Sequence, residues 1–100
     1  MSKQFTAKQR AYLRGLANTM QPILQVGKNG INENLIKQID DALEARELIK
    51  ITVLETAPES AREASAQLAG LTNSQQVQVI GFKFVLYRES KENKKIQLPR

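Results

Sequence analysis

The chain has 100 residues, 41% of them hydrophobic, and a formal net charge of +5. This length suits one small domain, and no apolar run approaches the roughly 18 residues of a membrane-spanning helix. Without cysteine or histidine, the chain can form no disulfide or thiolate metal site, and it lacks the commonest general base of enzymes. The polar N-terminus has no signal-peptide core. These features favour a cytoplasmic protein with no membrane role, no cofactor, no metal site and no catalytic residues.

The charge is unevenly distributed along the chain. Residues 1–32 carry five basic side chains and no acidic one, whereas residues 33–63 carry eight acidic and four basic side chains. Residues 64–100 carry six basic and two acidic side chains. A basic start and end around an acidic middle predict one positive face, which would attract a polyanion such as nucleic acid. A charge that only keeps the protein soluble is the alternative explanation.

The first predicted element is a helix over about residues 7–20. Thr6 and Gln9 have the spacing of a capping box, which marks its start. Apolar residues recur along it at helical spacing, and Arg10 and Arg14 fall on the opposite, polar side. Lys8 lies at the edge of the apolar stripe.

Six further elements follow in chain order. Asn32 is the expected N-cap of the second helix, Pro58 opens the third, and Gly70 ends it. A two-residue turn beginning with glycine joins the last two strands into a hairpin. The predicted ranges are a strand at 23–26, a helix at 33–46, a strand at 48–54, a helix at 58–68, and strands at 77–80 and 83–88.

This order, α-β-α-β-α-β-β, predicts an α/β fold in which helices cover a mixed four-stranded sheet. We expect a single domain over residues 1–88. Residues 89–100 are polar and basic, and we expect them to form a flexible tail.

A turn bracketed by glycines, Gly27-Lys28-Asn29-Gly30, follows the first strand. Asn-Gly favours a hairpin, but helical periodicity follows Gly30 in place of a second strand. At the N-terminus of a helix, free backbone N–H groups and the helix dipole favour an anion, and glycines allow close approach to the backbone. We therefore predict that this turn holds a phosphate with the help of Lys28. An ordinary tight turn is the alternative, and the Walker phosphate-binding pattern is absent.

Residues 81–87, Gly-Phe-Lys-Phe-Val-Leu-Tyr, look like a signature of the RNA-recognition motif. That fold needs a helix and another strand after this segment, and only residues 88–100 remain. We therefore expect Phe82, Phe84 and Tyr87 to be hairpin and core residues. Aromatic residues make up 5% of the chain, which argues against a base-stacking platform.

Taken together, the chain resembles the CRM domain family (chloroplast RNA splicing and ribosome maturation), and in particular its stand-alone, YhbY-like bacterial members. The resemblance covers roughly residues 5–88, in order and at natural spacing. It is carried by the segments FTAKQRAYLRGLA at 5–17, QVGKNG at 25–30, ELIK at 47–50, VIG at 79–81 and VLYR at 85–88. One departure is Asn32, where a threonine is common, but asparagine caps a helix equally well.

The resemblance implies a fold similar to the C-terminal domain of translation initiation factor 3, which agrees with the predicted order of elements. It also implies a non-enzymatic RNA-binding protein, since plant members assist intron splicing and bacterial members associate with precursors of the large ribosomal subunit. The expected partner is RNA, in particular large-subunit rRNA or pre-ribosomal particles, bound by a monomer. The implied RNA-binding residues are Gly27, Lys28, Asn29 and Gly30 in the turn and Lys8, Arg10 and Arg14 on the first helix.

Two other functions stay open at this point. The acidic second helix, at residues 33–44, could bind a partner protein, which would make the chain an adaptor. An RNA-processing enzyme would need converging carboxylates, but the adjacent Asp40 and Asp41 diverge by about 100° on a helix. Arg10 and Arg14 could also belong to an ordinary solvated helix face.

Overall fold

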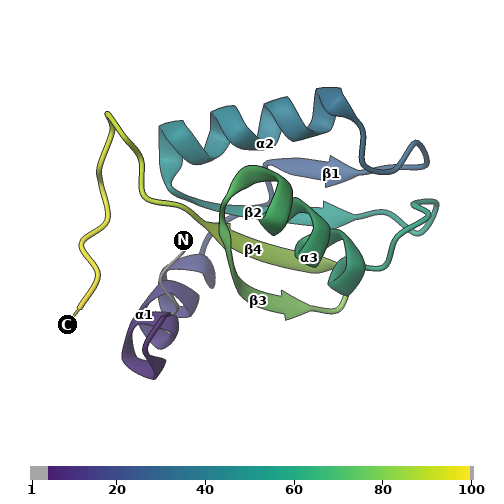
Figure 1. Cartoon of the computed structure of the whole chain (residues 1–100). Coiled ribbons are helices and arrows are strands. Elements are labelled where there is room, and N and C mark those ends of the chain that lie inside the picture. Colours follow the sequence, from purple (N-terminus) through teal and green to yellow (C-terminus); the bar gives the residue numbers. More distant parts are fainter. Residues whose placement is uncertain (1–4, 100) are drawn as a thin grey trace.

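A four-stranded mixed sheet with the strand order β1-β2-β4-β3 forms the middle of the molecule (Figure 1). The computed structural model describes residues 5–99. The elements are α1 (Ala7–Ala17), β1 (Leu24–Val26), α2 (Glu33–Arg46), β2 (Leu48–Val53), α3 (Ala61–Thr72), β3 (Gln75–Ile80) and β4 (Lys83–Tyr87). β1 runs parallel to β2, whereas β4 is antiparallel to both β2 and β3. The predicted α/β class and the order of elements are therefore confirmed.

The sheet separates two helical layers. Side chains alternate along a strand, so Ile49 and Ile51 of β2 face one side while Leu48 faces the other. Helices α2 and α3 cover the first side, where the main core consists of Val26, Leu35, Ile39, Leu43, Ile49, Ile51, Val53, Ala61, Ala64, Leu68, Ala69, Phe84 and Leu86. Helix α1 lies alone on the other side, over Leu48, Val77, Val85 and Tyr87. No helix within residues 5–99 is long and apolar enough to cross a membrane.

Helix α1 begins where the capping residues predict. Gln9 N donates to Thr6 Oγ1 at 3.1 Å, and Thr6 N donates to Gln9 Oε1 at 3.2 Å. The helix ends at Ala17 and does not reach Met20. A 3₁₀-type turn follows the helix, since Met20 N donates to the oxygen of Ala17 in an i to i−3 bond.

Helix α3 begins at Ala61, so the predicted start at Pro58 is wrong. Ser60 and Glu63 form a second capping box, in which Ser60 N donates to Glu63 Oε1 at 2.9 Å and Glu63 N to Ser60 Oγ at 3.1 Å. The satisfied backbone N–H groups of Ser60 and Glu63 define the start more strongly than the fixed φ of a proline.

The other end of α3 also differs from the prediction. Gly70 lies inside the last turn, and the left-handed C-cap is Asn73, with φ 54°, whose N–H donates to the oxygen of Ala69. Asparagine tolerates the left-handed conformation better than other residues with a Cβ. The predicted end of the helix at Gly70 is therefore wrong.

The hairpin of β3 and β4 forms as predicted. Gly81 has φ 56°, which suits the first central position of a type II′ turn. β3 starts at Gln75, earlier than predicted, and contains a bulge between Gln76 and Gln78. Phe84 and Tyr87 are buried in the two cores, as expected, whereas Phe82 at the turn is 60% exposed.

Residues 89–98, the C-terminal strap, run from the end of β4 past α2 and then toward α1 (Figure 1). Glu47, the fully buried C-cap of α2, accepts backbone hydrogen bonds from Ser90 at 2.7 Å, Lys95 at 2.6 Å and Ile96 at 2.8 Å. The strap is thereby tied to the domain through main-chain groups.

The strap also contacts α1 and its core. Ile96 and Leu98 pack against the apolar cluster beneath α1, and Gln9 Nε2 donates to the oxygen of Pro99 at 3.0 Å. The sequence predicts a flexible tail at 89–100, of which Arg100 lies outside the described residues. In the structure, residues of this segment up to Pro99 make the contacts given above. The reason is a buried carboxylate that needs donors and finds them in backbone N–H groups remote in sequence.

The strap should loosen in acid. Burial raises the pKa of Glu47, but the backbone N–H groups of Ser90, Lys95 and Ile96 outweigh it, so its pKa lies below the ordinary 4.5. The Ser90 hydroxyl and the N–H groups of Lys91 and Glu92 lower the pKa of Glu44 in the same way. A carboxyl group whose pKa is lower in the folded state than in the unfolded state stabilises the fold when it is ionised. This stabilisation is fully present above the unfolded-state pKa and is lost as the pH falls through the folded-state pKa.

We therefore expect the free energy of unfolding to be constant above about pH 5 and to decrease steadily below pH 4.5. Urea unfolding at pH 7, 5, 4 and 3 would measure this decrease. The variant Glu44→Gln, Glu47→Gln provides the control, because it lacks both carboxylates and its stability should change less over the same range. An equal acid dependence of both proteins would show that other carboxylates cause it.

Candidate nucleic-acid interface

The glycine turn Gly27–Gly30 joins β1 to α2 as a closed β-turn, in which Gly30 N donates to the oxygen of Gly27 at 2.9 Å. Its two glycines differ in their surroundings. Gly30 is buried and has φ 67°, whereas Gly27 is half-buried and does not have a positive φ. Lys28 and Asn29 are exposed at the tip. The turn therefore presents Lys28, Asn29 and the backbone around Gly27 to a ligand. The buried Gly30, with its positive φ, allows the backbone to follow the path of the turn.

The turn forms one wall of a groove of about 330 Å³. Its other walls are one residue of β1 and the first turns of α2. The lining residues are Gln25, Gly27, Lys28, Asn29, Gly30, Asn32, Asn34, Leu35 and Gln38. Five of these residues carry carboxamides, which offer both donors and acceptors, and the single charged residue is Lys28. This chemistry suits a polar anionic ligand such as a nucleotide.

The N-terminus of α2 opens into this groove. Asn32 caps the helix as predicted, since its side-chain oxygen accepts from Leu35 N at 2.8 Å. Within residues 5–99, the N–H groups of Glu33 and Asn34 have no protein acceptor. Free first-turn N–H groups carry the positive end of the helix dipole and attract an anion.

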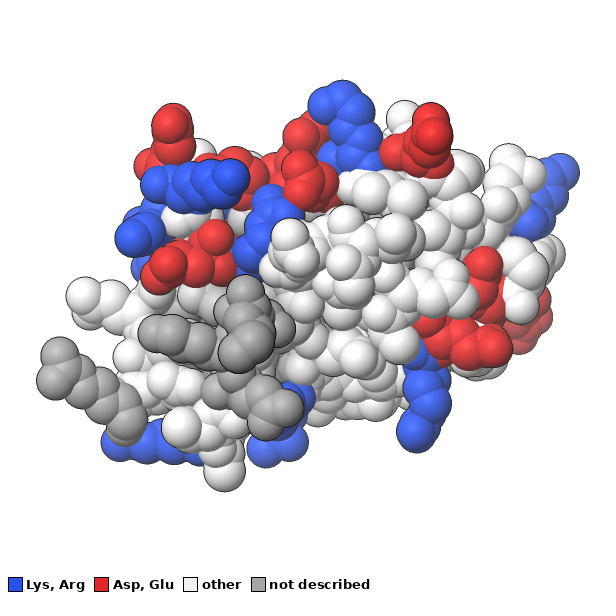
Figure 2. Space-filling view, in the orientation of Figure 1, with Lys and Arg blue, Asp and Glu red and all other residues white. Residues whose placement is uncertain are grey.

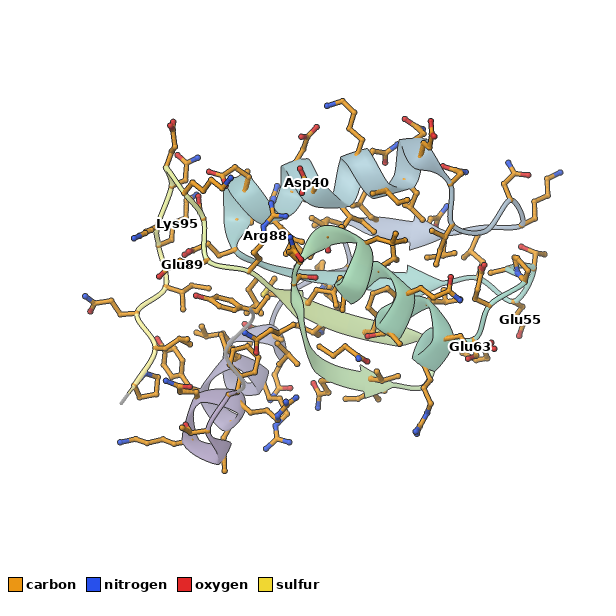
Figure 3. All side chains as sticks on the ribbon, in the orientation of Figure 1. Asp40, Glu55, Glu63, Arg88, Glu89 and Lys95 are labelled. Atoms are coloured by element: carbon orange, nitrogen blue, oxygen red, sulfur yellow. The ribbon has the colours of Figure 1, made fainter. Side chains whose placement is uncertain are left out.

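An acidic loop borders the turn on its other side. A Cβ on Gly30 would lie 2.9 Å from Pro58 Cγ and 3.1 Å from Glu59 Oε1. Within the described part of the chain, Glu59 Oε1 is buried without a hydrogen-bond partner. Figure 3 shows Glu55 in this loop and Glu63 at the start of α3, at the same end of the molecule. A polyanion would therefore approach the turn from the carboxamide side, where the groove contains no acid.

The three basic side chains of α1 differ in what they contact. Lys8 and Arg14 are exposed, whereas Arg10 is half-buried. Arg10 Nη1 donates to the carbonyl oxygens of Gln76 at 2.8 Å and Val77 at 3.0 Å. These carbonyls belong to the bulge of β3. At a bulge the ladder of hydrogen bonds to the neighbouring strand is interrupted, which leaves main-chain groups unpaired.

The guanidinium of Arg10 also lies 5.5 Å from the centre of the Phe5 ring, a cation–π contact. Arg10 thus joins α1 to the edge strand β3. Lys8 and Arg14 are the two side chains of α1 that remain available to a ligand among the three predicted.

The structure does not bring the predicted residues into one cluster. Figure 1 shows α1 at one end of the molecule and the turn between β1 and α2 at the other. Lys8 and Arg14 cannot therefore contact the same phosphate as Lys28. A ligand that reaches both must be an extended polymer.

The charges are segregated by layer. Neither α1 nor any of the four strands contains Asp or Glu. All ten acidic residues lie on α2, at its C-cap, on the loop between β2 and α3, on α3 or on the strap. Figure 2 shows acidic side chains over α2, near the strap and at the end of the β2–α3 loop, while the charged side chains visible along the lower edge are basic. By its charge, the α1 side of the molecule is therefore better suited to a polyanion than the α2 side.

Sequence reasoning missed three carboxamides of the groove, Gln25, Asn34 and Gln38. Asn34 and Gln38 are four residues apart on a helix, so their shared face was a usable signal. Gln25 is the outward residue of a three-residue strand, and nothing in the sequence indicates that it borders α2.

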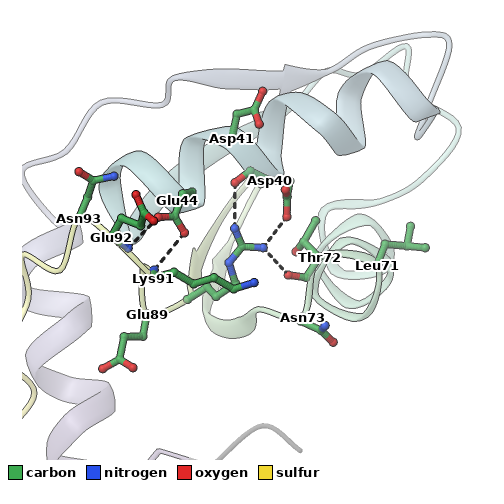
Figure 4. A pocket seen from close by; sticks show the side chains of 11 residues that line it. Asp40, Asp41, Glu44, Leu71, Thr72, Asn73, Glu89, Lys91, Glu92 and Asn93 are labelled. Atoms are coloured by element: carbon green, nitrogen blue, oxygen red, sulfur yellow. Dashed lines mark hydrogen bonds and ion pairs between the residues drawn. The ribbon is translucent and has the colours of Figure 1, made fainter.

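A second, acidic groove of about 630 Å³ lies between α2, the end of α3 and the strap (Figure 4). Arg88 is held there by Asp40, with Nη1 donating to Asp40 Oδ1 and Nη2 to the Asp40 carbonyl, and Nη1 also donates to the oxygen of Thr72 at 2.7 Å. Figure 4 shows Glu44 bonded to the strap through the N–H groups of Lys91 and Glu92. Among residues 5–99 no group of three or more acidic side chains is placed to hold a metal ion.

Known proteins resemble this chain in both sequence and fold. The profile of the CRS1 / YhbY (CRM) domain matches residues 5–88. The chain is 53% identical over 94 residues to a Bacillus subtilis protein named Probable RNA-binding protein YqeI, covering 94% of this chain and 98% of YqeI. It is 40% identical over 95 residues to a Haemophilus influenzae protein named RNA-binding protein, covering 95% of each.

A solved structure shows the same fold. The solution structure of SAV1595 from Staphylococcus aureus superposes with a TM-score of 0.79 at 56% sequence identity, covering 96% of this chain and 100% of that one. The profile match, the two bacterial relatives and the shared fold agree over most of the chain. The chain belongs to the CRS1 / YhbY (CRM) domain family.

Proposed function

We propose that this protein binds RNA without catalysing a reaction and associates with precursors of the large ribosomal subunit as an assembly factor. The observation that carries the proposal is the segregation of charge, with α1 and all four strands free of acidic residues. Phosphates dominate protein–nucleic acid affinity, so an acid-free basic side is the surface that RNA would contact. Relatives named RNA-binding proteins, such as those of Bacillus subtilis and Haemophilus influenzae, support the same partner.

In this proposal the β1–α2 groove and α1 hold different parts of one RNA. A phosphate lies near Lys28 and the first N–H groups of α2, and the carboxamides of the groove bond to the adjoining ribose or base. Lys8 and Arg14 contact phosphates further along. Arg10 acts through its contacts to β3, by setting the position of α1. Such contacts orient the RNA more than they read its sequence, so its shape contributes much of the specificity.

An adaptor role through the acidic side of α2 has less support. Asp40 is paired with Arg88, Glu44 is bonded to Ser90 and the strap, and Asp41 faces Lys37 at 3.2 Å. These carboxylates already have partners within the chain, so a basic partner protein would have to displace them.

Sedimentation of a cell lysate through a density gradient tests the proposal. We expect the wild-type protein to travel with large-subunit precursors, and Lys28→Glu and the double variant Lys8→Glu, Arg14→Glu each to shift toward the top of the gradient. Loss of one phosphate contact together with added repulsion should weaken binding to a precursor-rRNA transcript by roughly tenfold for Lys28→Glu.

The control is Lys37→Glu, which changes the charge equally but lies on the exposed side of α2. It should sediment as the wild-type protein does. Wild-type protein that stays at the top of the gradient and binds no precursor rRNA would contradict the proposal. Cleavage of that transcript by pure protein and Mg²⁺ would contradict its non-enzymatic part.

A further inference from the structure

The α1 side of the sheet is covered over only part of its length. Helix α1 packs over Leu48, Val77, Val85 and Tyr87, which lie toward the ends of β2 and β4 that meet the strap. The opposite ends of the strands carry a row of side chains above which no helix of residues 5–99 lies. This uncovered row is formed by Gln25 on β1, Thr52 on β2, Lys83 on β4 and Ile80 on β3.

The strand register places these four residues side by side across the whole sheet. Gln25 pairs with Thr52, Thr52 with Lys83, and Lys83 with Ile80. Neighbouring strands lie about 4.8 Å apart, so the row spans roughly 15 Å. Directly paired residues point to the same face. That face is the α1 side, because Val85, two residues from Lys83, packs beneath α1.

The row is open and free of acid. Gln25 and Lys83 are exposed, Thr52 is half-buried, and Ile80 is 60% exposed. Lys50, two residues before Thr52 on the same face, adds a second positive charge and is half-buried. The strands contain no acidic residue to pair with either lysine.

The row also lies between the two predicted RNA contacts. It occupies the part of the sheet that α1 leaves open, and Gln25 belongs both to the row and to the wall of the β1–α2 groove. A polymer that contacts α1 and the turn, at opposite ends of the molecule, has this face as its direct route (Figure 1).

We propose that the uncovered row and the adjacent Lys50 bind a single-stranded segment of RNA, with phosphates at Lys50 and Lys83 and base or ribose groups at Gln25 and Thr52. This inference rests on the proposed RNA-binding function and assigns four contacts to it beyond the turn and α1. A single strand fits better than a duplex, because carboxamide and hydroxyl groups can reach base edges that a duplex hides, and Ile80 offers an apolar surface to an unstacked base.

Fluorescence anisotropy with a labelled 20-nucleotide single-stranded RNA of mixed sequence, and with the duplex of that sequence, tests the inference. We compare Lys50→Gln, Lys83→Gln with the matched double variant Lys37→Gln, Lys91→Gln, which removes the same charge from α2 and the strap. The row variant should bind the single strand roughly tenfold more weakly at 100 mM salt. The slope of log K against log salt should become shallower by about 1.4, or 0.7 for each lost contact. The control should stay within twofold of the wild-type protein.

Protection from acetylation gives a readout that needs no variant. In wild-type protein, the single strand should slow acetylation of Lys83 but not of Lys37. Equal binding by the row and control variants, together with unprotected Lys83, would overturn the inference and leave the proposed function standing. Stronger binding of the duplex than of the single strand would also overturn it. Failure of the wild-type protein to bind either RNA or precursor rRNA would remove both the function and the inference.

Discussion

Replacing Glu47 by alanine is expected to lower the free energy of unfolding by about 3–5 kcal/mol. Its carboxylate is fully buried and accepts three backbone hydrogen bonds, from Ser90, Lys95 and Ile96. Alanine leaves all three N–H groups without an acceptor. Hydrogen bonds to a charged group contribute about 1.5–3 kcal/mol each, and the three are not fully additive. Domains of this size are stable by only about 5–15 kcal/mol in total, so the loss is large.

Urea unfolding would measure this loss, and hydrogen exchange at Ser90, Lys95 and Ile96 would show whether the strap is released. Glu47→Gly is the matched control for the backbone, because Glu47 has φ 68°, which glycine adopts without strain. It should be about 1 kcal/mol more stable than Glu47→Ala. Unchanged exchange at the three amides in Glu47→Ala would show that the carboxylate does not hold the strap.

Release of the strap should also remove contacts that hold α1 in place. Ile96 and Leu98 pack in the cluster under α1, and Gln9 bonds to Pro99. Glu47 lies at the end of α2, on the acidic side, yet its loss removes contacts that cover the basic helix. The position of Lys8 and Arg14 therefore depends partly on a residue that is far from any RNA contact.

The second large effect is expected at the glycine turn, where Gly30→Ala should destabilise the protein by about 2–3 kcal/mol. Gly30 has φ 67°, a conformation that costs a residue with a Cβ about 1–2 kcal/mol. The added Cβ would also lie 2.9 Å from Pro58 Cγ and 3.1 Å from Glu59 Oε1. A proline ring cannot rotate away as a flexible side chain can, so the loop between β2 and α3 must shift.

Gly27→Ala is the matched variant, and its stability should stay within about 0.5 kcal/mol of the wild-type protein. A Cβ there would meet only Leu54 Cδ1, at 3.8 Å. RNA affinity should nevertheless fall, because the methyl group would block close approach of a phosphate to the backbone. Thermal unfolding and RNA binding, measured on both variants, separate the two roles. Equal loss of stability at Gly27 and Gly30 would contradict the geometry of the turn.

Local features of the fold were predictable from sequence. The capping pair Thr6 and Gln9, the cap at Asn32 and the hairpin at Gly81 all formed as expected. Each depends on groups within two to four residues of one another, so short-range geometry and conformational preference decide them. The helix boundaries predicted at Met20, Pro58 and Gly70 differ from the structure for equally local reasons. These are the i to i−3 bond of Met20 to Ala17, the capping box at Ser60 and the left-handed C-cap at Asn73.

The candidate site was predictable only in its composition. The residue types that suit a polyanion, namely Lys8, Arg14, Lys28 and the glycine turn, follow from the sequence. Their separation at opposite ends of the molecule (Figure 1) does not, because the distance between α1 and the turn depends on the order of strands in the sheet. The strand register likewise aligns Gln25 and Lys83, which are remote in the chain.

The sequence by itself determined the order of elements, the caps and the uneven charge, because neighbouring residues are enough to specify them. Only the tertiary structure decided that Arg10 bonds to the bulge of β3, that Glu47 holds the strap, and that Gly30 packs against Pro58. Each of these depends on a partner distant in the chain, such as Gln76 for Arg10 and Ser90 for Glu47. No periodicity or spacing encodes such a pairing, which exists only once the sheet has brought the two segments together.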